Sequence, residues 1–333
     1  MTGKLPFEKI ERTLIDKRPA KTDSKFGGDP NKRSTEDLIK YGVVNVDKPK
    51  GPTSHLVSAY TKQILGLTKC GHSGTLDPGV TGVLAVALDR ATRVVQSLLT
   101  AGKEYVCIMH LHSVVDEAKI HEVCDSFVGR MKQLPPVKSA VKRQWRYRKI
   151  YYFDILEITE QDVLFVVGCQ AGTYIRKLCH DIGEKLGVGG HMSELRRTKA
   201  GPFDESTCHS LQELQDAFTF WKTEGNDTYI RKLIQPMENA VAHLGKVYVL
   251  DSTVGTLCHG ADLKTPGIAK VDSDIQAEEP IAIMTLKGEL VALGTAMMIS
   301  KEMIDEDKGL AVRVDKVFMD AGTYPKIPPK ASL

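Results

Sequence analysis

The sequence contains no apolar run long enough to cross a membrane as a helix. Its longest apolar stretches are short, such as Val83 to Leu88, whereas a membrane-spanning helix needs about 20 predominantly apolar residues. The first ten residues, MTGKLPFEKI, carry charges where a secretory signal peptide needs its apolar segment. We therefore expect a soluble intracellular protein.

Cysteine and histidine are too scattered to predict a disulfide framework or a metal site. The seven cysteines form no Cys-x-x-Cys pair, and an odd, dispersed set is typical of reduced thiols in apolar positions. His110 and His112 would lie on one face of a strand, but no cysteine or carboxylate ligand pattern accompanies them. We therefore predict two surface histidines there and no bound metal.

Neither sign of charge dominates the chain, so any surface for nucleic acid must be local. The 45 lysines and arginines oppose 42 acidic residues, which gives a net charge of +3. Residues 137–149 hold no acidic side chain and mix cations with aromatic residues: Lys138, Lys142, Arg143, Arg146, Arg148 and Lys149 with Trp145 and Tyr147. This mixture suits phosphate contacts and stacking on unpaired bases, although a charge run is also typical of a solvated face. Arg196, Arg197 and Lys199 form a second basic patch.

The length and the residue pattern predict an arm followed by two domains. Residues 1–40 are polar and interrupted by proline and glycine, as in an extended arm that needs a surface to lie on. Over 41–245, helical and strand patterns are interspersed without a regular βαβ repeat, which predicts an α+β domain around a mixed or antiparallel sheet. From 246 to 333, short strands separated by glycine and aspartate turns predict a small all-β domain.

Within the larger domain, helical spacing of apolar residues predicts helices over 120–131 and 173–186. Alternation predicts strands over 104–112, 150–158 and 163–169. Residues 71–79 are interrupted by glycine and proline and are expected to form a loop.

Asp77 and Arg176 are the first candidates for chemistry. Asp77-Pro78-Gly79 alone is a turn pattern, but glycines 71, 74 and 79 would also let the backbone approach a ligand closely. The loop lacks the Gly-Lys-Ser/Thr ending of an NTPase phosphate loop. Arg176, one turn into the helix predicted over 173–186, can point along the edge of the core toward a carboxylate, and an exposed helical arginine is the ordinary alternative.

Five segments occur in a fixed order: 46–55 (VDKPKGPTSH), 71–78 (GHSGTLDP), 102–105 (GKEY), 172–176 (GTYIR) and 190–197 (GHMSELRR). Together they resemble the pseudouridine synthases of the TruB superfamily, and more closely the H/ACA branch that includes dyskerin. Residues 259–263 (HGADL) and 266–268 (PGI) resemble a PUA domain. The resemblance covers residues 37–325 and implies a pseudouridine synthase domain over 41–245, a PUA domain over 246–333, and an arm over 1–40 that folds back on the PUA domain.

The resemblance also implies roles for individual residues. Asp77 is expected to be the catalytic aspartate, Tyr105 to stack on the target base and assist proton removal, and Arg176 to pair with the aspartate. Lys48 matches the basic residue of the first motif and is the fourth catalytic candidate. The implied substrate-binding residues are His72, Gly74, Thr75, Leu178, Lys138, Lys142, Arg143, Arg146, Arg196 and Arg197. The implied guide-RNA-binding residues are His259, Gly260, Ala261 and Lys264.

The implied reaction is the isomerisation of uridine, which breaks the bond from the sugar to ring nitrogen 1 and rejoins the base at carbon 5. It is redox-neutral and needs no metal or cofactor. It needs one carboxylate, which acts as nucleophile or as base on the sugar and stabilises positive charge on the ribose. An arginine partner keeps that carboxylate ionised, and the base must leave its stack at a cost of a few kcal/mol.

Lys138 favours one of two branches of the superfamily. Stand-alone enzymes carry a tyrosine at its place after Pro135-Pro136, and a lysine followed by basic residues is typical of the H/ACA branch. That branch implies a guide RNA bound by the PUA domain, an rRNA substrate and three small partner proteins. The partners are a zinc-containing protein on the catalytic domain, a glycine-arginine-type protein and a kink-turn-binding ribosomal-type protein.

Two alternatives to guided catalysis stay open: a guide-independent enzyme acting on the TΨC loop of tRNA, and an RNA-binding scaffold with a silent site. The C-terminus lacks a lysine-rich tail, so we expect an archaeal, cytoplasmic protein, or else a truncated nucleolar one from a eukaryote.

Overall fold

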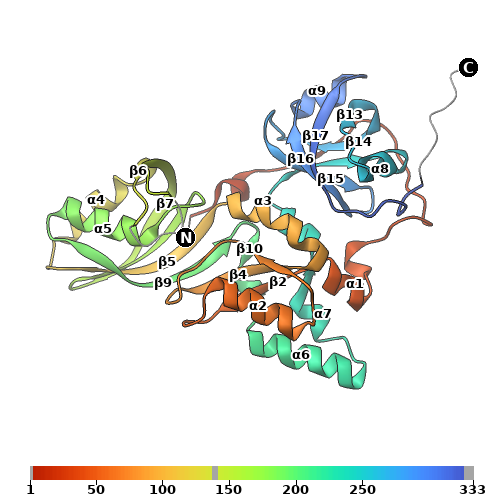
Figure 1. The fold of residues 1–333 in the computed structure, drawn as a ribbon. Helices are drawn as coiled ribbons and strands as arrows, with labels where there is room; N and C mark the ends of the chain where they lie inside the picture. The colour runs from red at the N-terminus through yellow and green to blue at the C-terminus, as the bar shows by residue number, and fades with distance from the viewer. Residues whose placement is uncertain (1–2, 137–141, 326–333) are drawn as a thin grey trace, which may run out of the picture.

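The computed structural model describes residues 3–136 and 142–325, and it places two sheets side by side (Figure 1). The larger sheet has ten strands and the smaller one has seven. We call the part built on the larger sheet the catalytic module and the part built on the smaller sheet the C-terminal module. None of the helices in the described residues has the length and hydrophobicity needed to span a membrane.

The larger sheet is antiparallel except at one pair of strands. Its main path runs β11 (Ile234–Pro236), β2 (Gly42–Lys48), β4 (Thr81–Leu88), β9 (Gly190–Ala200), β5 (Lys103–Leu111), β8 (Asp162–Cys169), β7 (Arg146–Thr159) and β6 (Gly129–Gln133). The short strands β3 (Cys70–His72) and β10 (Phe203–Asp204) pair with β4 and β9. Only β4 and β9 run parallel, and they share just two residue pairs, Thr81 with Arg196 and Gly82 with Arg197. We call this short contact the seam, because it joins two antiparallel halves.

Each half of the larger sheet has its own apolar core. Beyond the seam, α4 (Glu117–Asp125) and α5 (Ile175–Leu186) cover β5, β7 and β8, and Leu178 and Ile182 are fully buried there. On the other half, α2 (Ser54–Ile64), α6 (Leu211–Glu224) and α7 (Ile230–Leu233) pack against β2 and β4. Figure 1 shows these two groups of helices at separate places along the sheet.

The C-terminal module is a twisted sheet with two short helices, α8 (Asp251–Cys258) and α9 (Ser300–Asp305). Its strands follow the order β1 (Leu14–Asp16), β14 (Ile268–Asp272), β12 (Gly245–Val249), β15 (Pro280–Thr285), β16 (Leu290–Ala296), β17 (Leu310–Val317) and β13 (Leu263–Lys264). The module lies against the half of the larger sheet that carries β4 (Figure 1), since apolar side chains of both modules share one core.

The N-terminal arm contacts both modules, whereas the sequence predicted contact with the C-terminal one. β1 extends the smaller sheet by pairing with β14. Leu5, however, is buried against Tyr152 and Val166 of the larger sheet, and α1 (Thr35–Lys40) packs on β2 and β11. The arm therefore packs partly on the catalytic module and partly on the C-terminal module.

The predicted elements differ from the observed ones where glycines redirect the chain. The helix predicted over 120–131 ends at Asp125, because Gly129, with φ 101°, leads the chain into β6. Strand β9 was not predicted, since its residues show no regular apolar alternation. Other elements missing from the prediction are short, and they include α1, α8, α9, β1, β3, β10, β11, β13 and β14.

Gly82 makes the seam possible. Its φ is +100°, and a Cβ at this position would lie 2.2 Å from the carbonyl oxygen of Arg197. We expect Gly82→Ala to lower the free energy of unfolding by about 3 kcal/mol, from backbone strain and separation of the two strands. Guanidinium denaturation checks this, with Gly79→Ala as the control because a Cβ at Gly79 meets open space. Equal stability losses in the two variants would contradict the prediction.

Candidate active site

A cleft of about 610 Å³ opens over the seam. Its walls come from the loop before β4, the start of β5, the segment before α5, and β9. The lining residues include Gly74, Thr75, Asp77, Lys103, Tyr105, Ile175, Arg176, Leu195 and Arg197. Residues from four distant parts of the sequence therefore meet where the two halves of the sheet join.

Asp77 lies in the loop between β3 and β4, and the side chain of Ser54 holds this loop from one side. The hydroxyl of Ser54, the first residue of α2, accepts a hydrogen bond from the Leu76 amide at 2.8 Å. Thr53 caps α2 by accepting from the Leu56 amide. The cap and the loop contact thus use adjacent residues of the segment 46–55, and the residue before Asp77 is fixed.

Lys48 holds the same loop from below. Its side chain is fully buried, and Nζ donates to the carbonyls of Pro49 (2.9 Å), Pro78 (3.2 Å) and Val80 (2.7 Å). All three donors of the ammonium group are therefore used, and burial lowers the pKa of Lys48. Lys48 does not line the cleft, so its position fits support of the loop rather than contact with a substrate.

Arg176 reaches Asp77 across the cleft. The two residues are 99 positions apart in sequence, and the Arg176 guanidinium forms an ion pair and hydrogen bond with the Asp77 carboxylate. Arg176 lies at the N-terminal end of α5, which begins at Ile175, and not one turn into the helix as the sequence predicted. Both side chains are about half exposed, so solvent and a substrate can reach the pair.

The segment before α5 is fixed to β6. The Gln133 side chain accepts from the Tyr174 amide at 2.8 Å and donates to the Tyr174 carbonyl at 3.0 Å. Two hydrogen bonds from one amide group define the direction in which α5 starts, and hence the position of Arg176.

Tyr105 and Arg197 are cross-strand neighbours on β5 and β9. Arg197 is only 1% exposed, and its guanidinium donates to the carbonyls of Val83 (2.8 Å) and Gly74 (3.3 Å). Burial raises the pKa of Tyr105, and the positive charge of Arg197 opposes that increase. The cleft thus holds a protonated phenol beside a buried cation.

Lys103 forms part of the floor of the cleft and had no assigned role in the sequence-based prediction. Its ammonium group donates to the carbonyls of Leu98, Leu99 and Ala101 at 2.7–3.0 Å, at the C-terminal end of α3 (Val95–Thr100). Burial lowers the pKa of Lys103 to about 7, while the negative end of the helix favours the charged form.

Comparison with known proteins identifies the family to which this chain belongs. Residues 62–175 match the N-terminal domain of TruB family pseudouridylate synthases, and residues 176–242 match the C-terminal domain of tRNA pseudouridylate synthase B. Residues 245–318 match the PUA domain and residues 2–58 the DKCLD domain. A probable tRNA pseudouridine synthase B from Methanopyrus kandleri is 54% identical over 97% of this chain and 95% of its own. The chain belongs to the TruB family of pseudouridine synthases.

Other relatives and solved structures also match nearly the whole chain. The probable tRNA pseudouridine synthase B of Pyrococcus abyssi is 56% identical over 97% of both chains. In a crystal structure of a Cbf5-Nop10-Gar1 complex, one chain is 57% identical with a TM-score of 0.93, over 97% of this chain and 98% of its own. A chain in an H/ACA ribonucleoprotein bound to a substrate RNA containing 2′-deoxyuridine is 54% identical with a TM-score of 0.91, over 97% of this chain and 99% of its own. The predicted fold class, an α+β domain followed by a PUA domain, is confirmed.

Not every residue predicted for substrate binding lines the cleft of this TruB-family chain. Leu178 is fully buried on the core face of α5, whereas Leu76, Leu99 and Leu195 line the cleft. Leu195 stands directly before the two arginines of the fifth segment, and this position was the signal in the sequence that could have pointed to it as a cleft residue. His72 lies in β3 outside the lining, and burial lowers its pKa.

The basic residues divide into paired and exposed groups. Arg196 binds Asp47 through two hydrogen bonds at 3.0 and 3.1 Å and also contacts Glu205, so carboxylates hold much of its guanidinium. Lys142 and Arg143 are exposed, and Arg146 begins β7. Lys138 lies outside the described residues.

The residues predicted to bind guide RNA lie together on the C-terminal module. His259, Gly260 and Ala261 form an exposed turn after α8, and the exposed Lys264 follows in β13. Among the predicted surface histidines, His110 contacts Asp162 at 2.7 Å and His112 contacts His191 at 3.0 Å.

Proposed function

We propose that this chain converts uridine to pseudouridine in an RNA that a guide RNA places in the cleft, with Asp77 as the catalytic carboxylate. The observation that carries the proposal is the ion pair between Asp77 and Arg176 at the lip of the cleft. A carboxylate held by an arginine is the group that glycosidic cleavage at the ribose needs. The guided form is supported by the match to a chain in an H/ACA ribonucleoprotein with substrate RNA.

The residues of the cleft support a sequence of steps. The target base enters over Tyr105, whose ring offsets part of the unstacking cost. Asp77 then acts on the sugar while the bond from its carbon 1 to ring nitrogen 1 breaks. As a nucleophile it forms an ester at that carbon, which carbon 5 of the turned base displaces; as a base it removes a sugar proton, which returns to the sugar when carbon 5 bonds. The proton on carbon 5 leaves last, with Tyr105 as the assisting group, and nitrogen 1 gains a proton. The isomerisation involves no net oxidation or reduction, so the residues of the chain can carry it out without a redox partner.

The partners follow from the same relatives. Solved chains similar to this one occur in complexes with Nop10 and Gar1, and we assign equivalents of these proteins and an H/ACA guide RNA to this chain. The exposed turn at 259–261 with Lys264 is our candidate for contact with the guide. Because the relatives are archaeal, we expect the particle in the cytoplasm.

A second candidate is guide-independent action on tRNA. It is favoured by the description of the relatives as probable tRNA pseudouridine synthases B. The chemistry at Asp77 would be identical, and only the means of placing the uridine would differ.

Tritium release from RNA labelled at uridine carbon 5 tests both candidates. The full chain is assayed alone and after assembly with guide RNA and the partner proteins, on rRNA fragments and on tRNA. Release from rRNA only after assembly supports the guided function, and equal release from tRNA by the chain alone supports the second candidate. Tight binding of guide RNA with no release on either substrate would leave an RNA-binding scaffold and overturn the proposal.

Lys48 offers a test of loop support. We expect Lys48→Met to lower kcat about 30-fold, because the carbonyls of Pro78 and Val80 lose the donor that fixes the turn carrying Asp77. The free energy of unfolding should fall by only about 2 kcal/mol, since removal of a buried charge offsets part of the lost hydrogen bonding. Single-turnover tritium release and thermal unfolding measure the two effects, with Lys62→Met, exposed on α2, as the control. A large stability loss with unchanged kcat in the folded fraction would contradict this role.

A further inference from the structure

The contact between the two modules is largely apolar. Residues of the catalytic module such as Val43, Val83 and Leu98 share a core with Ala282, Met284 and Phe318 of the C-terminal module. Apolar burial stabilises such a contact but is non-directional. The directional contacts at the junction therefore add the constraint on the angle between the modules that apolar burial alone does not supply.

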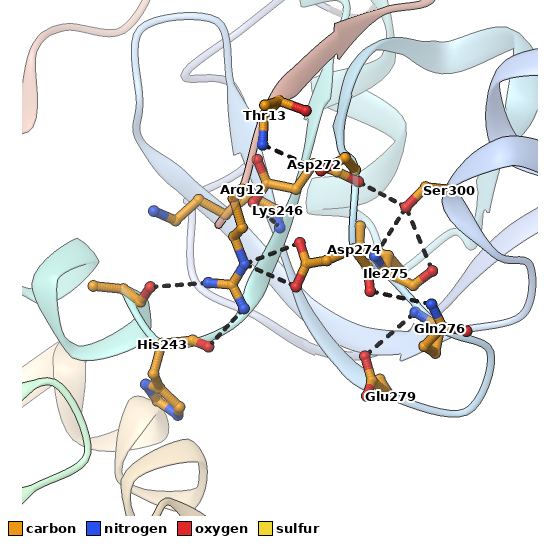
Figure 2. Close-up of polar contacts among 12 residues, drawn as sticks. Arg12, Thr13, His243, Lys246, Asp272, Asp274, Ile275, Gln276, Glu279 and Ser300 are labelled. Atoms are coloured by element: carbon orange, nitrogen blue, oxygen red, sulfur yellow. Dashed lines mark hydrogen bonds and ion pairs between the residues drawn. The ribbon is translucent and has the colours of Figure 1, made fainter. Parts of the chain in front are cut away.

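Arg12 makes the most extensive of these polar contacts. Its Nε lies 3.0 Å from both carboxylate oxygens of Asp274, which follows β14 in the C-terminal module. The two remaining nitrogens donate to the carbonyls of His243 (3.1 Å) and Ala242 (3.4 Å), just after the catalytic module ends in a 3-10 helix (Met237–Val241). Figure 2 shows Arg12 between Asp274 on one side and His243 on the other.

The backbone around Arg12 belongs to the C-terminal module. The Thr13 amide donates to the Ser273 hydroxyl at 3.1 Å, and the Ser273 amide donates to the Thr13 carbonyl at 2.9 Å. β1, which begins at Leu14, then pairs with β14. Arg12 is therefore anchored on one module, and its planar guanidinium holds two successive carbonyls leading from the other.

His243, whose carbonyl Arg12 binds, packs toward the cleft. The His243 ring is buried, packs edge-on against Phe7 at 6.0 Å between centroids, and lies near Ser97 and near Gly201, which directly follows β9. Ser97 lies in α3, and Lys103 binds the C-terminal end of that helix while lining the cleft. A continuous set of packed groups thus connects Asp274 with the floor of the cleft.

Other polar contacts at the junction remain without Arg12. Tyr41 donates to the Asp320 carboxylate at 2.9 Å, and Arg93 donates to the Val317 carbonyl at 2.7 Å. The Glu238 carboxylate accepts from the Leu290 amide at 3.0 Å and is held by Arg33 through two hydrogen bonds of 2.8 Å. With these contacts and the shared core intact, loss of Arg12 would leave the modules attached. The side of the junction where Arg12 lies would lose its polar link, which widens the range of angles between the modules.

We propose that Arg12 is a positioning residue that sets the angle between the C-terminal module and the cleft, and thereby the register in which a bound guide RNA presents its target uridine. The register part rests on the proposed guided function. The angle part concerns the chain by itself.

Arg12→Ala tests the register, with Lys17→Ala as the matched control. Lys17 also belongs to the arm, but its ammonium donates only to carbonyls of the C-terminal module, those of Met303, Ile304 and Glu306 at 2.8–2.9 Å. Single-turnover tritium release is measured in the assembled particle with guides whose lower stem is unaltered, or longer or shorter by one base pair. We expect Arg12→Ala to lower release with the unaltered guide about tenfold and to reduce the preference for that guide. Arg12→Lys should fall between, because an ammonium lacks the planar fork.

A distance measurement tests the angle without any catalysis. Spectroscopic probes are introduced as unnatural amino acids at Lys222 in α6 and Lys301 in α9, both exposed. We expect a broader distance distribution in Arg12→Ala and an unchanged one in Lys17→Ala. An unchanged distribution in Arg12→Ala, or an equal loss of activity on all guides matched by Lys17→Ala, would overturn the proposal. Absence of guided release from the unaltered chain would instead refute the proposed function, and the distances would still decide the role of Arg12.

Discussion

Asp77→Asn is expected to abolish tritium release while leaving the particle assembled. The asparagine keeps the shape of the side chain and an oxygen that can accept from Arg176, so the loop and α5 should stay in place. It cannot act as nucleophile or base at the sugar, and it carries no charge to stabilise positive charge on the ribose. We therefore expect a fall in the single-turnover rate on the order of 10⁴-fold or more, with unchanged binding of guide and substrate RNA.

Two further variants sharpen this experiment. Asp77→Glu keeps the carboxylate but moves it by one methylene, and we expect a loss of about 10²-fold. Asp216→Asn, on the exposed surface of α6, is the control for a charge removed away from the cleft. A rate for Asp77→Asn within tenfold of the unaltered chain would exclude Asp77 as the catalytic group.

The pairing of Asp77 with Arg176 was expected from the family resemblance, whereas the residues alone predicted only the two elements that carry them. Glycine and proline predict the loop around Asp77, and helical spacing predicts α5. What the residues alone could not show is that these elements meet, since their contact depends on the seam between β4 and β9. Only two residue pairs form this seam, and β9 carries no alternation that predicts a strand.

The position of Leu195 could not be predicted for the same reason, whereas that of Leu178 could. The spacing of Ile175, Leu178 and Ile182 correctly predicts one buried helical face, which places Leu178 in the core. The binding role of Leu178 came from the resemblance and stays a prediction. Leu195 could be assigned to the cleft only after β9 was known to lie beside β5.

Lys48 illustrates a second limit of the sequence. A lysine beside a Pro-Lys-Gly-Pro stretch indicates a basic site, and its ordinary location is the surface. Here three carbonyls of neighbouring turns converge on its ammonium group, and such convergence is a property of the folded backbone. The residue is important for the same loop that the sequence singled out, but through support of the backbone.

Tyr105→Phe is expected to separate stacking from proton removal. The phenylalanine ring can still stack on the base, so binding of substrate RNA should be unchanged, whereas loss of the hydroxyl should slow release of the carbon-5 proton by about 10²-fold. A Tyr105→Leu variant, which loses both functions, should also weaken substrate binding.

The pH dependence of the single-turnover rate tests whether the Tyr105 hydroxyl takes part in proton removal. Burial raises the pKa of Tyr105, so only a small fraction of the phenol is ionised near neutral pH. If the phenolate removes the proton, the single-turnover rate rises with pH through that range, because each increment in pH increases the ionised fraction until the raised pKa is reached. Tyr105→Phe should remove this rise and leave a flat profile. A profile that rises equally in both proteins would assign proton removal to another group, and Tyr105 would then serve only to stack on the base.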